Sequence, residues 1–207
     1  MQINKIKNVI FDLGGVLIDW NPEYVYNKVF NNDTEKVHWF LNTVCTSDWN
    51  IEQDGGRTIE EAVALKIAEF PQYEDWIRIY YNQWHHMFSG AINKNIELFK
   101  NLKASGNYKI YALTNWSAQT WPKALELFPF LNEFDGVVVS GKEKTRKPFS
   151  KIYHIILNRY AINPENAIFI DDNIDNILAA NSLKLNGVHF KSPNQLNKKL
   201  LAYDIKF

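Results

Sequence analysis

The chain has 207 residues, 46% of them hydrophobic, and its 23 Lys and Arg residues balance its 23 Asp and Glu residues. A net charge of zero gives no electrostatic reason to expect a nucleic acid or an anionic membrane as partner. Cys45 is the single cysteine, which excludes an internal disulfide framework and is typical of a reducing compartment. The apolar run near the N-terminus is too short for a signal peptide or a membrane span, so we predict a soluble cytoplasmic protein.

Five short runs rich in β-branched and aromatic residues predict strands at 8–11, 108–113, 136–139, 167–170 and 187–190. Helical spacing of apolar residues predicts helices at 121–128, 152–159 and 174–183, and a last helix begins after Ser192, its expected cap. Strands that alternate with helices indicate the α/β class, with a parallel sheet covered on both faces.

The segment 20–89 differs from the rest of the chain because it contains no convincing strand. Its pattern predicts helices at about 33–44, 58–69 and 74–87, the second opening on a capping box at Thr58 and Glu61. We therefore predict two units: a core of residues 1–19 and 90–207, and an all-helical insert of residues 20–89. A long crossover would explain the helical insert, but a lid over the sheet edge is favoured because acidic residues lie at that edge.

Chemically reactive side chains follow the predicted strands of the core. Asp12 ends the first strand, Thr114-Asn115 follows the second, and Asp171-Asp172 follows the fourth. The run Arg146-Lys147-Pro148 comes after the third strand and before a helix. In open α/β sheets, ligands bind beyond the carboxyl ends of the strands, so we expect these groups to meet there.

The chemistry of this set points to phosphoryl transfer. Three carboxylates in one small site repel one another and stay ionised only if cations compensate them. Mg²⁺, which prefers carboxylate and water oxygens, is one such cation, and Lys147 is another. Together with the Thr114 hydroxyl, they suit transfer through an aspartyl-phosphate intermediate. An EF-hand calcium loop at 171–182 is excluded, because Asn176 and Ser182 stand where the loop needs Gly and Glu.

With these motifs in this order, the chain resembles the haloacid dehalogenase superfamily of hydrolases. The motifs are IFDLGGV with Asp12, YALTN with Thr114 and Asn115, RKP with Lys147, and IFIDDNIDN with Asp171, Asp172 and Asn176. They cover residues 9 to about 180, and four motifs in order are specific where one alone is weak. The resemblance implies a Rossmann-like sheet of order 5-4-1-2-3 with an all-helical cap inserted after the first strand. The subgroup that it resembles contains sugar-phosphate phosphatases and the phosphatase domain of soluble epoxide hydrolase.

The resemblance also implies a metal site. Asp12, the backbone carbonyl of Gly14 and Asp172 would bind Mg²⁺, with Asp171 as a further or water-mediated ligand. Asn176 lies one helical turn after Asp172, on the same face, from which it would orient the metal shell.

A phosphate site is implied beside the metal. Asp12 would be the nucleophile that attacks phosphorus. Thr114, the N–H of Asn115 and Lys147 would bind the phosphate, and Asp12, Lys147 and Thr114 would be the catalytic set. Removal of Lys147 should cost orders of magnitude in rate, because electrostatic stabilisation is usually the largest contribution to catalysis.

Gly14 departs from the family pattern. Most phosphatases of the superfamily carry Asp two residues after the nucleophile, where it protonates the leaving group, a role worth about 10²–10⁴-fold in rate. A phosphatase without it would favour leaving groups that need little protonation, such as sugar 1-phosphates. Alternatively, Asp19 or a residue of the insert, Glu52 or Asp54, would supply the proton.

Three functions stay open at this point. The first is a Mg²⁺-dependent phosphatase of a small phosphorylated metabolite, with a sugar phosphate favoured. The second is a catalytically weak binding or regulatory protein, against which the complete set of motifs argues. The third is a metal-independent haloacid dehalogenase, in which the pair Asp171-Asp172 would lack a compensating cation. We predict the first.

Four further residues are candidates for the walls of the substrate pocket. They are Asp19, Trp20, Trp49 and Trp116, which follow the first and second motifs or lie in the insert. Aromatic rings stack on sugar faces and exclude water, although packing between the insert and the core explains the tryptophans equally well. The surface is compatible with a monomer or a homodimer.

Overall fold

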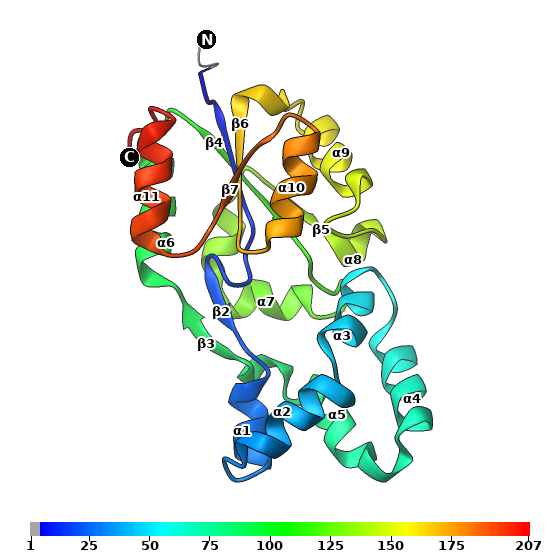
Figure 1. Cartoon of the computed structure of the whole chain (residues 1–207). Helices are drawn as coiled ribbons and strands as arrows, with labels where there is room; N and C mark the ends of the chain where they lie inside the picture. The colour runs from blue at the N-terminus through cyan, green and yellow to red at the C-terminus, as the bar shows by residue number, and fades with distance from the viewer. Residues whose placement is uncertain (1–4) are drawn as a thin grey trace.

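A five-stranded parallel sheet forms the centre of the computed structural model, which describes residues 5–207 (Figure 1). The first four residues of the predicted core segment lie outside the described residues. The sheet contains β1 (Asn8–Phe11), β4 (Lys109–Thr114), β5 (Gly136–Val139), β6 (Ala167–Asp171) and β7 (Asn186–His189). Its order is β5-β4-β1-β6-β7, which confirms the predicted order when the five strands are counted along the chain.

Helices cover both faces of the sheet because its central strands carry apolar residues at successive positions, which point alternately to the two faces. Val9 and Phe11 of β1 point to the face covered by α6 (Asn93–Ala104) and α11 (Pro193–Ala202), whereas Ile10 points to the face covered by α9 (Ser150–Arg159) and α10 (Ile174–Ser182). The helices of the core are α6 (Asn93–Ala104), α7 (Trp121–Leu127), α8 (Ser140–Glu143), α9 (Ser150–Arg159), α10 (Ile174–Ser182) and α11 (Pro193–Ala202), with short 3₁₀ helices at Pro129–Glu133 and Pro164–Asn166.

The helical insert lies at the carboxyl end of the strands, in the lower half of Figure 1. Its core is aromatic: the rings of Tyr26 and Phe40 lie 4.7 Å apart, and those of Phe30 and Trp76 lie 4.9 Å apart. Tyr26 also donates a hydrogen bond to the carbonyl of Trp76. The insert contains α1 (Glu23–Val29), α2 (Thr34–Thr43), α3 (Ser47–Asp54), α4 (Ile59–Glu69) and α5 (Glu74–Asn82), with 3₁₀ helices at Pro71–Tyr73 and Trp84–His86.

A two-stranded antiparallel ribbon joins the insert to the core. It pairs β2 (Ile18–Trp20) with β3 (Phe88–Ala91), and both predicted boundaries of the insert fall within it. The ribbon was not predicted, because its strands are short and lie about 70 residues apart in the sequence. The predicted helix 74–87 is also wrong beyond Asn82, where the chain turns at Gln83 and continues as a 3₁₀ helix.

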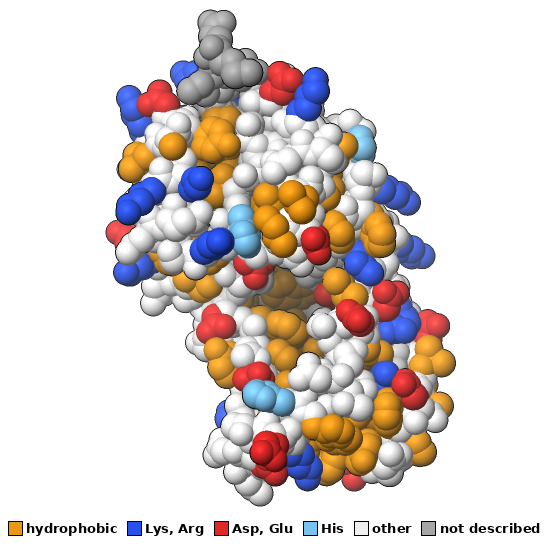
Figure 2. All heavy atoms as spheres, in the orientation of Figure 1, with side chains coloured by type: hydrophobic (Ala, Val, Ile, Leu, Met, Phe, Trp, Pro, Cys, Tyr) orange, Lys and Arg blue, Asp and Glu red, His pale blue; other side chains and the backbone are white. Residues whose placement is uncertain are grey.

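A hollow separates the core from the insert on the face shown in Figure 2, and hydrophobic side chains line its floor. None of the helices in residues 5–207 is both long enough and apolar enough to cross a membrane.

Candidate active site

The reactive side chains meet at the carboxyl ends of three adjacent strands, as predicted. Asp12 follows β1, Thr114 ends β4 and Asp171 ends β6. Lys147, from the loop between α8 and α9, places its ammonium 2.8 Å from Asp12 Oδ1 and 2.7 Å from Asp171 Oδ2. Only 1% of Lys147 is exposed, so this three-residue ion cluster is held away from solvent.

The cluster carries more negative than positive charge. Carboxylate oxygens of Asp12, Asp171 and Asp172 all lie within 4.8 Å of one another, and Asp172 is the exposed member. Lys147 compensates one of these three charges, which leaves two for a divalent cation to neutralise. Three convergent oxygen donors are also the ligands that Mg²⁺ prefers, so the residues present fit this ion.

The pKa shifts of the site residues reflect the same excess of negative charge. Burial raises the pKa of Asp12, Lys147 opposes the rise, and the charges of Asp171 and Asp172 add to it. Burial and the Asp171 charge likewise raise the pKa of Asp172. Burial alone would lower the pKa of Lys147, but the two carboxylates beside it raise that pKa above its ordinary value. Lys147 is therefore a fixed positive charge at neutral pH.

Asp171 is held by more partners than Asp172. Asn176 Nδ2 lies 3.0 and 3.1 Å from its two carboxylate oxygens, and the backbone N–H of Asn173 donates to Oδ1 at 2.8 Å. Tyr153 in turn donates to the carbonyl of Asn176. The predicted orienting residue Asn176 thus acts on Asp171, which leaves the exposed Asp172 freer to bind an ion.

The second motif positions the lysine. Asn115 Oδ1 accepts from the backbone N–H of Lys147 at 2.9 Å, and Asn115 Nδ2 donates to the Lys147 carbonyl at 3.1 Å. The buried hydroxyl of Thr114 has no hydrogen-bond partner within the described chain. An unpartnered buried donor at a strand end is the arrangement expected of a group that binds an oxyanion. Binding of phosphate by Thr114, Lys147 and the N–H of Asn115 stays a prediction.

The two glycines after Asp12 have different roles. Gly15 adopts a left-handed φ of 70°, and a Cβ atom built on it would overlap the carboxylate of Asp172. This position therefore requires glycine, both for the turn and for the approach of Asp172. A Cβ atom on Gly14 would meet nothing within 4 Å, and its φ is not left-handed. Neither steric crowding nor backbone conformation requires a glycine at position 14.

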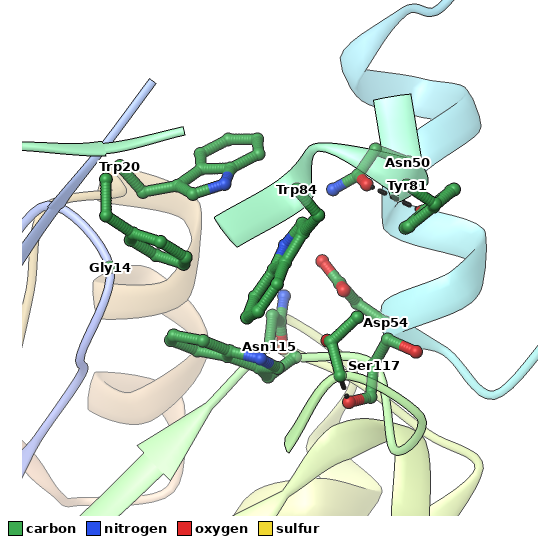
Figure 3. A pocket seen from close by; sticks show the side chains of 11 residues that line it. Gly14, Trp20, Asn50, Asp54, Tyr81, Trp84, Asn115 and Ser117 are labelled. Carbon is green, nitrogen blue, oxygen red and sulfur yellow. Dashed lines mark hydrogen bonds between the residues drawn. The ribbon is translucent and has the colours of Figure 1, made fainter. Parts of the chain in front are cut away.

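A cavity of about 120 Å³ lies between the core and the insert (Figure 3). Gly14 and Asn115 bring the core's motifs to its wall, and Asp54 reaches it from the end of α3. Its aromatic wall joins core and insert, since the rings of Trp84 and Trp116 lie 5.8 Å apart. The complete lining is Gly14, Trp20, Asn50, Asp54, Tyr81, Trp84, Phe88, Asn115, Trp116, Ser117 and Thr120.

Two of the four predicted wall residues, Trp20 and Trp116, line this cavity, and two do not. Trp49 packs inside the insert instead, where its indole N–H donates to the Ala62 carbonyl and its ring lies 5.1 Å from that of Tyr80. Asp19 accepts hydrogen bonds from the hydroxyls of Tyr24 and Ser89 on the ribbon side.

Sequence reasoning missed Trp84 and Phe88, whose rings lie 4.9 Å apart in the wall. A signal for them exists in the sequence. Phe88 lies one position and Trp84 five positions before the predicted boundary at residue 89, and Trp20 follows the other boundary. Large aromatic residues beside the boundaries of an insert are candidates for the interface that it makes with the core.

Ser140 ties the insert to the core beside the cavity, and this contact was also not predicted. Its hydroxyl donates to the backbone carbonyl of Asp54 at 2.5 Å and accepts from the N–H of Trp116 at 2.8 Å. An ion pair of 3.3 Å between Arg146 and Glu52 lies nearby. The end of α3 is therefore anchored to the first residue of α8 and, through it, to the loop that follows β4.

The fold and the site together define a Rossmann-like α/β enzyme with an acidic strand-end centre. The family model of haloacid dehalogenase-like hydrolases matches residues 6–184. The chain belongs to this haloacid dehalogenase-like hydrolase family, as its motifs predicted.

Relatives in this family include named phosphatases. A sesquiterpene phosphatase of Aspergillus oryzae is 26% identical over 88% of this chain and 89% of its own. A phosphorylated carbohydrates phosphatase of Thermotoga maritima is 24% identical over 87% of this chain and 83% of its own. Both matches support a phosphatase activity for this chain.

Solved structures support the fold. A haloacid dehalogenase family enzyme of Bacteroides thetaiotaomicron, in complex with magnesium and inorganic phosphate, matches with a TM-score of 0.65 and 23% identity. The match covers 90% of this chain and 94% of that one.

Proposed function

We propose that this protein is a Mg²⁺-dependent phosphatase that hydrolyses a small phosphorylated metabolite through an aspartyl-phosphate on Asp12. One observation carries the proposal: Lys147 compensates only part of the charge of Asp12, Asp171 and Asp172, so that one divalent cation completes the site. The phosphatase relatives support the reaction class. The Bacteroides enzyme, which holds magnesium and phosphate, supports the metal.

The residues of the chain have separate tasks in this reaction. Asp12 Oδ1 accepts from Lys147 and from the N–H of Leu13 at 2.7 Å, which fixes the orientation of the nucleophilic carboxylate. An oxygen of Asp12 attacks phosphorus, while Lys147 and the free hydroxyl of Thr114 stabilise the charge on the phosphoryl oxygens.

Asp12, Asp172 and the carbonyl of Gly14 would hold Mg²⁺, with Asp171 as a further or water-mediated ligand. When bound, the ion supplies positive charge to the phosphoryl oxygens and orients them.

The cavity favours a compact polar leaving group, such as a sugar. Rings of Trp20, Trp84 and Trp116 offer apolar faces, while Asn50 and Asp54 offer hydrogen-bonding groups from the insert. Sugars match both the apolar faces and the hydrogen-bonding groups, since their ring faces stack on aromatic rings and their hydroxyls need hydrogen-bond partners. A terpenoid chain has no hydroxyls to pair with the remaining hydrogen-bonding capacity of Asn50 and Asp54, whose partners in the chain are the phenol of Tyr81 and the N–H of Ser117. In this proposal the helical insert acts as a cap that encloses the substrate.

Phosphate release from a panel of sugar phosphates and p-nitrophenyl phosphate tests the proposal. We expect turnover in Mg²⁺, none after chelation of the metal, and none in the variant Asp12→Asn, whose folding is checked by thermal melting. No turnover across the panel would overturn the proposal in favour of a binding protein. Halide release from haloacids without metal would overturn it in favour of a dehalogenase.

A further inference from the structure

Gly14, two residues after the nucleophile, stands where most related phosphatases carry an acid, and the structure has space for a side chain there. Gly14 lines the cavity, and neither sterics nor its φ excludes a side chain there. The glycine therefore leaves open space in the cavity wall two residues after Asp12, with no side chain to protonate the leaving group of a phosphate ester. A proton donor for that group must then come from elsewhere in the wall.

Asp54 is the one residue of the described lining that carries a carboxyl group. The other two acids considered from the sequence are engaged elsewhere. Asp19 accepts from the hydroxyls of Tyr24 and Ser89, and Glu52 pairs with Arg146 at the surface. The phenol of Tyr81 also lines the cavity, but burial raises its pKa, which makes it a weak acid and therefore a poor proton donor at neutral pH.

The position of Asp54 is fixed by backbone contacts. It is the last residue of α3, and its carbonyl accepts the hydrogen bond from Ser140. The backbone N–H of Ser117 faces its carboxylate from the loop after β4. Figure 3 shows Asp54 reaching from the insert toward this loop, which carries Asn115 and Ser117. The Asp54 carboxyl group is contacted from both units, so its position is fixed when the insert packs against the core.

The surroundings of Asp54 give its carboxyl group a pKa suited to proton transfer at neutral pH. Burial raises the pKa to about 7, against the opposing effects of the Ser117 N–H, Arg146 and Lys147. From the insert, the phenols of Tyr80 and Tyr81 on α5 also face it. An acid whose pKa lies near the working pH is efficient both as donor and as acceptor.

We propose, on the basis of the phosphatase function above, that Asp54 is the general acid and base of the reaction. In the first step an oxygen of Asp12 forms a bond to phosphorus while the bond from phosphorus to the ester oxygen breaks. That oxygen keeps the electron pair and takes the proton of Asp54. In the second step water attacks phosphorus and gives a proton to the Asp54 carboxylate, while the bond to Asp12 breaks. Phosphate leaves, and both residues return to their starting states.

Leaving-group dependence in the variant Asp54→Asn tests this role. For esters of poor leaving groups, such as a sugar phosphate, kcat/KM should fall about 10²–10⁴-fold. For 2,4-dinitrophenyl phosphate, whose leaving group needs no proton, kcat/KM should change less than about threefold, because it reports the first step. The same substrate should give a burst of dinitrophenolate followed by slow turnover, because the base of the second step is missing.

The matched control is Asp48→Asn, an exposed carboxylate on the same helix, which should leave both substrates unaffected. Melting curves establish that each variant is folded, and Asp54→Ser replaces Asp54→Asn if the amide does not fold. An equal loss on both substrates, or no loss on either, would overturn the role of Asp54. A wild-type protein that hydrolyses no ester would instead overturn the proposed function itself.

The pH profile provides a second readout. In the wild type, kcat/KM for a sugar phosphate should fall as pH rises through about 7, because the protonated form of Asp54 is lost. This decrease should be absent for 2,4-dinitrophenyl phosphate and absent in Asp54→Asn. A decrease that persists unchanged in Asp54→Asn would assign the titration to another group and overturn the proposal.

Discussion

The two ends of the candidate site are built in different ways. At the charged end, Asp12, Lys147 and Asp171 all come from the core and lie within 3 Å of a partner. At the aromatic end, Trp84 comes from the insert and Trp116 from the core, and the cavity exists only where the two units meet. The nucleophile and its ion partners are therefore held by the core alone, while recognition and the proposed proton donor Asp54 depend on how the two units pack. This difference predicts that substitutions at the charged end cause large losses of activity, whereas substitutions at the aromatic end cause smaller, graded losses.

The largest effect is expected from Lys147→Met. Loss of the ammonium should lower kcat/KM about 10³-fold, because it removes stabilisation of the transferred charge. It should also lower the free energy of unfolding by about 3–5 kcal/mol, since the buried Asp171 would lose the one cation that neutralises it, although its hydrogen bonds from Asn173 and Asn176 remain. Phosphatase assays and denaturant unfolding without Mg²⁺ measure the two effects. Lys142→Met, at an exposed lysine of α8, is the control, and wild-type kinetics in Lys147→Met would contradict the expectation.

A smaller effect at the same end is expected from Gly15→Ala. The new Cβ atom would displace the Asp172 carboxylate, so the Mg²⁺ concentration for half-maximal activity should rise about 10–100-fold. The left-handed φ should add a cost of about 1–2 kcal/mol in folding free energy. Magnesium titrations and melting curves of Gly15→Ala and Gly14→Ala form a matched pair. If the two variants need the same Mg²⁺ concentration, Gly15 does not position Asp172.

At the aromatic end, Trp20→Ala should raise KM about 3–10-fold and change kcat little, because one stacking face is lost without any change in the charged cluster. Steady-state kinetics with the best sugar phosphate of the panel measure both constants. Trp39→Ala, at a more exposed tryptophan of the insert away from the cavity lining, is the control. A loss confined to kcat would show that Trp20 acts on the chemistry and not on recognition.

The smallest effect is expected from the pair of Arg146 and Glu52, which joins the insert to the core at the surface. Exposed ion pairs contribute about 0.2–1 kcal/mol. Arg146→Gln, Glu52→Gln and the double variant should therefore differ from the wild type by less than about fivefold in kcat/KM. A double-mutant cycle measures the coupling. A coupling energy well above 1 kcal/mol would make this pair, and not the aromatic wall, the main contact that holds the insert.

The sequence predicted the core well because its signals are local. Strands at 8–11 and 136–139 match β1 and β5, and the other three sheet strands differ only at their ends. Thr58 caps α4 as predicted, accepting from the N–H of Glu61 at 3.2 Å. Asp12 and Asp171 converge because a parallel sheet aligns the ends of their strands, so these two could be placed together without a structure, whereas Lys147 reaches them from the loop between α8 and α9.

The interface could not be predicted in the same way. Helix α3 has no strong apolar spacing, so nothing in its sequence shows that Trp49 faces Ala62 while Asp54 faces the cavity. The contact between Ser140 and Asp54 joins residues 86 positions apart. Such contacts depend on how two units pack, and a single sequence contains no periodic signal for that.

The contact between Ser140 and Asp54 has a consequence for protein engineering. Exchange of the insert for that of a relative is an obvious route to a new specificity, since most of the aromatic wall would change with it. With the proton donor on α3, the same exchange would also remove the acid and base, and the hybrid would form a phosphorylated Asp12 that hydrolyses slowly. Such a hybrid should regain turnover when an aspartate is added at Gly14, where the core has space for one.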